Sequence, residues 1–138
     1  EVMTLVQDRA KLKDIRIEQS LEKGLPRLYV DTEKLSIALV NIFINGIEAI
    51  EHSDGLLQVS VSSRQNSIFL RIADNGGGIA KEDLKKIFDP FFTQKSNGTG
   101  LGLTSTLNIL LSHNALIEVK STIGEGTVFE IEFPLPEM

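Results

Sequence analysis

The segment Asp74–Ile79 constrains the fold of this chain most strongly, because it places one carboxylate two residues before three consecutive glycines. The preceding run, Ile68–Ala73, alternates with the period of two that is typical of a β-strand. We therefore expect Asp74 at the sheet's edge, where the chain leaves regular structure. Glycines permit positive φ angles and put no side chain between the backbone and a ligand. The same residues are also ordinary turn chemistry, so this segment alone predicts either a binding loop or a plain turn.

The composition is that of a single globular domain. The chain has 138 residues, 41% of them hydrophobic, and a net charge of -5, which argues against nucleic acid or an anionic membrane as the main partner. It has no cysteine, which excludes disulfides, thiolate metal sites and cysteine nucleophiles. No apolar run approaches the ~20 residues that span a bilayer. Because residue 1 is Glu and not Met, we expect a fragment of a longer protein.

Hydrophobic spacing predicts the order of helices and strands along the chain. Helices are expected over residues 1–12, 32–50, 81–88 and 101–111, and strands over 15–21, 57–62, 67–73, 116–120 and 127–133. Asp31 or Thr32 is expected to cap the long helix. Residues 1–138 are therefore interpreted as one α+β domain, a layer sandwich with helices packed on one face of a sheet.

The long helix carries a polar edge beside its apolar stripe. Asn41, Asn45 and Glu48 follow one another at intervals of four and three residues, so they lie along one side of the helix. Gly46 costs about 1 kcal/mol relative to Ala there, which suggests that something approaches the backbone closely. An amide oxygen suits Mg²⁺. The alternative is a pair of Asn side chains that bond to the neighbouring backbone.

A second glycine cluster, Gly98–Leu103, begins a predicted helix. Backbone N–H groups at a helix N-terminus attract anions, and Lys95 adds positive charge, so this segment is a candidate phosphate cradle. It is neither a Rossmann fingerprint nor a Walker A loop. Residues 93–100 are expected to be exposed and mobile. The three phenylalanines within Phe88–Phe92 predict a small buried cluster that also anchors one end of a lid.

The two histidines are not predicted to be catalytic. His52 lies just past the expected end of the long helix, and we interpret it as an exposed helix-end residue. His113 lies where a helix ends before a strand, and we expect it to cap that helix.

Together these segments resemble the catalytic and ATP-binding domain of bacterial sensor histidine kinases, in the superfamily that includes gyrase and the Hsp90 chaperones. Four family motifs occur in order, and a closing glycine-threonine turn follows them: Asn41–Ala49, Asp74–Ile79, Phe88–Phe92, Gly98–Leu103 and Gly124–Thr127. The resemblance implies the Bergerat ATP-binding fold, a two-layer α/β sandwich with a mixed five-stranded sheet and about three helices on one face. ATP would lie between the asparagine helix and a lid over residues 79–102.

The resemblance also implies the site residues and their roles. Asp74 would accept a hydrogen bond from the adenine amino group, Asn45 would hold Mg²⁺, and Thr127 would assist near Asp74. The later glycines would wrap the phosphates with help from Lys95. The full set of expected nucleotide contacts is Asn41, Asn45, Asp74, Gly76, Gly78, Ile79, Lys95, Gly98, Thr99, Gly100, Leu101, Gly102, Leu103 and Thr127.

Three positions depart from the family pattern. Related hydrolases carry Glu at the position of Asn41, and an amide is no general base, which favours phosphoryl transfer over hydrolysis. Glu48 stands where many histidine kinases have a basic residue, so no phosphate contact is carried over to it. Gly46 replaces the usual alanine.

The phosphoacceptor histidine of the family is absent, since neither His52-Ser53 nor His113-Asn114 resembles it. The chain is therefore expected to bind ATP and Mg²⁺ without phosphorylating itself, with no catalytic residue of its own beyond positioning groups. The expected partners are a phosphoacceptor histidine domain of the parent protein and a response regulator, and no nucleic acid. The expected state is a cytoplasmic monomer, with membrane attachment of the parent left open. Alternatives are a non-catalytic nucleotide-sensing module and a serine kinase of the anti-sigma type.

Overall fold

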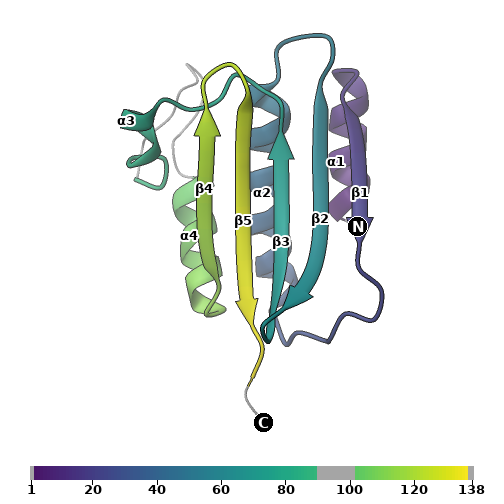
Figure 1. Ribbon diagram of the computed structural model, residues 1–138, viewed down its shortest axis with the longest axis vertical. Coiled ribbons are helices and arrows are strands. Elements are labelled where there is room, and N and C mark those ends of the chain that lie inside the picture. Colours follow the sequence, from purple (N-terminus) through teal and green to yellow (C-terminus); the bar gives the residue numbers. More distant parts are fainter. Residues whose placement is uncertain (1, 90–101, 137–138) are drawn as a thin grey trace.

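The computed structural model describes residues 2–89 and 102–136, which form one mixed sheet and its covering helices (Figure 1). The elements in chain order are α1 (Val2–Leu12), β1 (Arg16–Leu21), α2 (Thr32–Ala49), β2 (Leu56–Arg64), β3 (Ser67–Asp74), α3 (Lys81–Leu84), α4 (Gly102–Ser112), β4 (Leu116–Thr122) and β5 (Gly126–Pro134). In that part of the chain, no helix is long and apolar enough to cross a membrane.

The five strands follow the order β1-β2-β3-β5-β4, which puts β3 in the centre of the sheet. Strands β1 and β2 are parallel, and the other neighbours are antiparallel. Helices α1, α2 and α4 lie against one face of the sheet, while α3 stands beside β4 (Figure 1). The predicted α+β sandwich with a mixed five-stranded sheet and about three covering helices is confirmed.

Alternation along the strands determines which face meets the helices. In β5, Phe129, Ile131 and Phe133 are buried, whereas the residues between them are partly exposed. They join one core with the apolar side of α2, including Ile42 and Ile47. Each such side chain contributes roughly 1.5–3 kcal/mol through burial, so the alternation fixes which side of every strand faces inward.

Helix α2 begins directly after one of the two residues that were expected to cap it. Asp31 is its N-cap, and the Asp31 carboxylate accepts a hydrogen bond from the Lys34 backbone N–H at 3.1 Å. Of the two candidate caps, the structure selects Asp31 over Thr32. The segment 28–30 before it is not a strand.

The β2–β3 hairpin sets the register that flanks Asp74. Gln65 and Asn66 both have positive φ angles, 51° and 64°, as two-residue hairpin turns of type I′ require. The resulting register pairs Asp74 with Leu57 on β2 and with Thr127 on β5. Asp74 therefore lies between two neighbours at the end of the central strand, and not on an edge strand of the sheet.

The predicted helix over 81–88 is too long. Helix α3 covers only Lys81–Leu84, and no side chain caps it. The chain continues in tight turns, since the Lys86 N–H bonds to the carbonyl of Asp83 and the Asp89 N–H bonds to that of Lys86, both at 2.8 Å. Three-residue spacing of this kind is typical of a 3₁₀ path, which rarely extends far.

Candidate functional site

Asp74 is a partly buried carboxylate held in place by backbone groups. Its Oδ1 accepts a hydrogen bond from the Gly76 N–H at 2.9 Å. Burial raises the pKa of the Asp74 carboxyl above its ordinary value of 3.8, and backbone hydrogen bonds from Gly76 and Thr127 oppose that rise. The result is a fixed hydrogen-bond acceptor at the end of β3, and the position of Asp74 at that strand end is the one predicted from the sequence.

Helix α2 approaches this carboxylate at Gly46. A β-carbon at Gly46 would lie 3.1 Å from Cδ1 of Leu57 and 3.5 Å from Oδ2 of Asp74. The predicted close approach to the backbone at Gly46 is thus confirmed, and it comes from the chain itself. Asn45 directly precedes Gly46, so Asn45 lies at the level of α2 that is closest to the Asp74 carboxylate.

Asn41 is joined to α4. Its Nδ2 donates to the Thr106 hydroxyl at 3.3 Å, and that hydroxyl donates to the carbonyl of Ala38 at 3.5 Å. Thr106 is fully buried. The sequence left open an alternative in which the Asn side chains bond to the neighbouring backbone, whereas this bond of Asn41 goes to a side chain on another helix. The link fixes how α4 lies along the asparagine edge.

The three glycines of this loop, Gly76, Gly77 and Gly78, differ in how much room the surrounding chain leaves for a side chain. A β-carbon at Gly76 would lie 2.6 Å from the carbonyl oxygen of Ala49, and one at Gly78 would collide with the carbonyl of Thr122. Gly78 also has a φ of 79°. Only Gly77 has open space where a side chain would start. Contacts within the chain thus explain Gly76 and Gly78, whose expected nucleotide contacts remain predictions.

Ser121 is a residue of this site that the sequence interpretation missed. Its hydroxyl accepts from the Ile79 N–H at 2.6 Å, bonds to the Thr127 hydroxyl at 2.7 Å and donates to the carbonyl of Gly126 at 3.0 Å. Ser121 therefore fixes both Ile79, where the predicted lid begins, and Thr127, the neighbour of Asp74. The available signal was a hydroxyl on the inward face of β4, where Val119 precedes it.

Both histidines connect separate elements. His113 donates from Nδ1 to the carbonyl of Ile109 at 2.8 Å and accepts the Asp31 N–H on Nε2 at 3.0 Å. The predicted capping role of His113 is confirmed, because Ile109 lies in the last turn of α4. His52 is exposed, as predicted, but it also bonds to the loop after Asp74, through the carbonyl of Asn75 at 2.7 Å.

Of the second glycine cluster, Gly98–Leu103, the structure describes only the last two residues, Gly102 and Leu103. Helix α4 begins at Gly102, close to the predicted start, and Leu103 packs against the core. The Thr104 hydroxyl donates to the carbonyl of Phe88 at 2.8 Å, which ties the start of α4 to the phenylalanine motif. The remaining predicted residues Lys95, Gly98, Thr99, Gly100 and Leu101, together with Phe91 and Phe92, lie outside the described residues.

The described residues contain no group of three or more His, Asp and Glu side chains that could hold a metal ion. A metal at this site would therefore take an amide such as Asn45 as its protein ligand and fill its other positions from a ligand's oxygens and water. Mg²⁺ commonly binds in that way next to phosphates. The donor set of α2 thus fits Mg²⁺ only in the company of a phosphorylated ligand.

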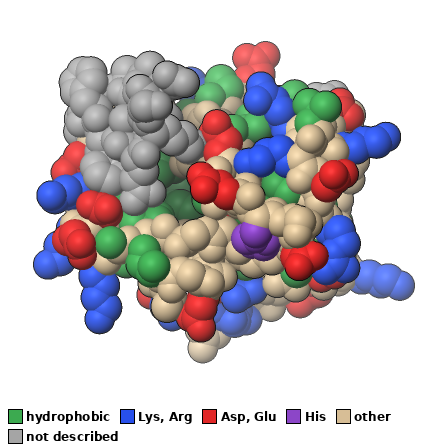
Figure 2. Space-filling model, turned by 90° about the horizontal axis from the view of Figure 1, so that it is seen from above, with side chains coloured by type: hydrophobic (Ala, Val, Ile, Leu, Met, Phe, Trp, Pro, Cys, Tyr) green, Lys and Arg blue, Asp and Glu red, His purple; other side chains and the backbone are tan. Residues whose placement is uncertain are grey.

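Figure 2 looks down on the end of the sheet where β3 finishes. A recess in this face has hydrophobic side chains on its floor, and acidic side chains border it. Such a mixture suits a ligand with a flat apolar part and a few polar atoms.

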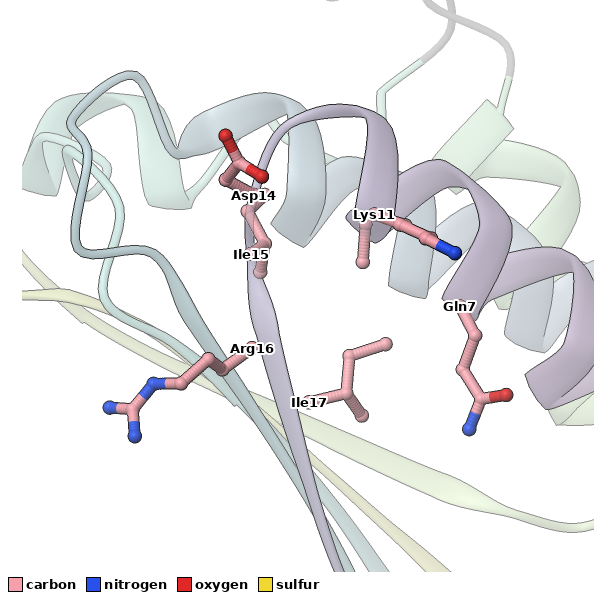
Figure 3. A pocket seen from close by; sticks show the side chains of 7 residues that line it. Gln7, Lys11, Asp14, Ile15, Arg16 and Ile17 are labelled. Atoms are coloured by element: carbon pink, nitrogen blue, oxygen red, sulfur yellow. The ribbon is translucent and has the colours of Figure 1, made fainter.

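A second hollow, of about 420 Å³, lies between α1 and β1 and is lined by Gln7, Ala10, Lys11, Asp14, Ile15, Arg16 and Ile17. Its polar side chains point away from one another (Figure 3). Because a ligand site needs convergent polar groups, this hollow is the weaker candidate.

Comparison with known proteins identifies relatives over nearly the whole chain. Residues 30–137 match the family described as histidine kinase-, DNA gyrase B-, and HSP90-like ATPase. The sensor histidine kinase ZraS of Salmonella typhi is 35% identical over 133 residues, covering 96% of this chain and 29% of ZraS. The chain thus spans less than a third of the length of that relative.

Solved structures share the fold. The catalytic domain of the histidine kinase ThkA in a nucleotide-free form matches with a TM-score of 0.84 and 28% identity, over 96% of this chain and 87% of that domain. Full-length ShkA in complex with AMPPNP matches with a TM-score of 0.85 and 25% identity, over 99% of this chain and 29% of ShkA. The sheet order and helix layer described above are therefore those of a histidine kinase catalytic domain.

Proposed function

This chain belongs to the family of histidine kinase-, DNA gyrase B- and HSP90-like ATPases, and we propose that it binds Mg-ATP and transfers the γ-phosphate to a histidine on a separate dimerisation domain. The observation that carries the proposal is the position of Asp74. Its carboxylate is fixed by backbone N–H groups at the end of the central strand, beside the asparagine edge of α2.

Asp74 is the group that selects the base. A carboxylate held by Gly76 accepts a hydrogen bond from an exocyclic amino group, which adenine has and guanine lacks at the corresponding position. A site built around such an acceptor discriminates well, because a wrong base leaves the partly buried carboxylate without a partner. Full-length ShkA, which shares this fold, was solved in complex with AMPPNP, and this supports a nucleotide as the ligand of this chain.

The phosphates extend from the base toward α2 and the start of α4. Asn45 would supply the protein oxygen for Mg²⁺, which would neutralise phosphate charge, and Asn41 would support the same edge through its bond to Thr106. The backbone N–H groups at the start of α4 face the phosphates, as the glycines from Gly98 onward suggest.

Transfer requires positioning more than covalent chemistry. The bond between the γ-phosphorus and the β-γ bridging oxygen breaks, a bond to an imidazole nitrogen of the acceptor forms, and ADP leaves. Asn41 stands where hydrolases of this superfamily carry a general base, and its amide donates to Thr106. Since no base is present at that position to activate water, the acceptor histidine is the favoured nucleophile.

The acceptor belongs to another part of the parent protein. The chain spans less than a third of ZraS, and neither His52 nor His113 is available as a nucleophile, because each bridges two backbone groups. We place the acceptor on a helical domain upstream of residue 1, with a response regulator downstream in the signalling pathway. The isolated domain acts as a monomer in the cytoplasm, where ATP is supplied.

The test is transfer of label from γ-labelled ATP to a separately supplied histidine domain of the parent protein. We expect acid-labile phosphate on the acceptor, no label on this chain alone, and loss of transfer with Asp74→Asn. Arg71→Ala, on the exposed face of β3, serves as the matched control and retains transfer. Nucleotide binding without any transfer would instead identify a nucleotide-sensing module, and acid-stable label on a protein substrate would identify a serine kinase.

A further inference from the structure

One peptide group connects His52 to the carboxylate of Asp74. The Asn75 carbonyl bonds to Nε2 of His52 at 2.7 Å, and the Gly76 N–H donates to Oδ1 of Asp74 at 2.9 Å. That carbonyl and that N–H belong to the same planar peptide, and in a trans peptide they point in opposite directions. The described residues contain no cis peptide. His52 and Asp74 therefore hold this peptide from its two sides.

The hydrogen bonds assign the tautomer of His52. The Asp54 backbone N–H lies 3.2 Å from Nδ1 of His52. A backbone N–H only donates, so Nδ1 carries a lone pair and the ring proton is on Nε2. His52 is thus a neutral imidazole whose Nε2–H donates to the Asn75 carbonyl.

The Asn75 side chain fixes the same peptide from the strand side. Its Oδ1 accepts the Leu56 N–H at 2.8 Å, and its Nδ2 donates to the carbonyl of Asp54 at 2.8 Å. The side chain therefore continues the β2–β3 ladder past the end of both strands. With Asn75 held in this way, the orientation of the next peptide depends on the bond from His52 and on its own bond to Asp74.

We infer that His52 is a positioning residue for nucleotide recognition, acting through the Asn75–Gly76 peptide on the carboxylate of Asp74. The inference rests on the proposed role of Asp74 in accepting the adenine amino group. A donor at the Asn75 carbonyl polarises the peptide and strengthens the Gly76 N–H as a donor, because hydrogen bonds in a chain reinforce one another. His52 lies outside all four family motifs.

Three variants separate this role from general stability. His52→Leu removes the donor. His52→Gln restores it, because the amide nitrogen of Gln reaches as far along the side chain as Nε2 does. His113→Leu is the matched control, since His113 also bridges two backbone groups but does so at the opposite end of α2. The acidic residues near His52 along the chain, namely Glu48, Glu51 and Asp54, are exposed and common to all variants.

The first measurement is the pKa of the Asp74 carboxyl by NMR in nucleotide-free protein. The Gly76 hydrogen bond lowers that pKa, so His52→Leu should raise it above the wild-type value. His52→Gln should return it toward the wild-type value, and His113→Leu should leave it unchanged. An Asp74 pKa that is the same in His52→Leu and wild type overturns the inference.

The second measurement is ADP affinity by calorimetry. His52→Leu should weaken ADP binding roughly tenfold, the worth of about one hydrogen bond, while His52→Gln stays within about twofold of wild type and His113→Leu does not change. Equal affinities in His52→Leu and wild type overturn the inference. A wild-type protein that binds no ADP, but in which the Asp74 pKa depends on His52, refutes the proposed function and leaves the coupling intact.

A second variant covers the case in which His52→Leu does not fold. His52→Ala also removes the donor at the Asn75 carbonyl, so it should weaken ADP binding roughly tenfold. An ADP affinity in His52→Ala equal to that of wild type overturns the inference.

Discussion

Gly46 of α2 and Asp74 of β3 face each other so closely that a β-carbon at Gly46 would lie 3.5 Å from Oδ2 of the carboxylate. That distance is an ordinary contact, whereas the 3.1 Å to Cδ1 of Leu57 is tight. Helix α2 therefore packs directly against the base-selecting carboxylate, and a larger side chain at position 46 would displace Asp74.

Gly46→Ala should raise the free energy of unfolding by about 0.5 kcal/mol. Ala gains about 1 kcal/mol of helix propensity over Gly, and a small shift of the Leu57 side chain takes back part of that gain. Urea unfolding measures the difference. Gly46→Val is the contrasting variant, since its extra methyl groups meet Leu57 and Asp74 directly, and it should destabilise the domain. A destabilised Gly46→Ala protein would show that Leu57 has no room to move.

Asp74→Asn should weaken ATP and ADP to the same extent, because both carry the same base. The expected loss is about tenfold to a hundredfold, as for a hydrogen bond to a charged group. Calorimetry with both nucleotides measures this loss. A loss confined to ATP would show that Asp74 acts on the phosphates and not on the base.

The stability of the nucleotide-free domain should also depend on Asp74 through pH. Burial raises the folded-state pKa of this carboxyl. Its contribution to stability is therefore fully present below the ordinary pKa of 3.8 and is lost as the pH rises through the folded-state value. Asp74→Asn should lack this part of the pH profile. An identical profile in both proteins would mean that burial does not perturb the carboxyl.

The glycines after Asp74 should respond differently to alanine. Gly78→Ala should cost at least about 2 kcal/mol, because the positive φ is strained for Ala and the carbonyl of Thr122 occupies the space. Gly77→Ala is the matched control and should change stability by less than about 0.5 kcal/mol. Thermal unfolding compares the two, and equal effects would contradict the contact assigned to Gly78.

Asn45→Ala should remove the Mg²⁺ dependence of nucleotide binding while the fold is retained, since Asn45 is only partly buried. Calorimetric titration of ADP with and without Mg²⁺ measures this, and circular dichroism checks the fold. Glu48→Gln is a control on the same exposed edge, and it should retain the Mg²⁺ dependence. Unchanged Mg²⁺ dependence in Asn45→Ala would remove the metal assignment.

Thr106→Val should destabilise the domain by about 1 kcal/mol and weaken ATP binding, because the hydroxyl that receives Asn41 is lost from a fully buried position. Thr106→Ser keeps the hydroxyl and loses a methyl group, so it should bind ATP like wild type at some cost in stability. Similar ATP affinity in both variants would show that the bond between Asn41 and Thr106 does not contribute to nucleotide binding.

Much of the fold could be predicted from local patterns. Alternation in Ile68–Ala73 identified β3 and the place where Asp74 leaves it, and capping chemistry narrowed the N-cap of α2 to Asp31 or Thr32, of which the structure has Asp31. The prediction of a helix over 81–88 was too long. A helical pattern of apolar residues does not exclude the tighter three-residue turns that the chain adopts after Leu84.

The sequence by itself determined the order of the elements, the buried face of each and the motifs that identify the family, since all of these depend on neighbours along the chain. Only the tertiary structure decided which residues meet: Asn41 with Thr106, His52 with the carbonyl of Asn75, and Gly78 with that of Thr122. The physical reason is that periodicity states which side of an element is buried, whereas its partner depends on how the layers pack.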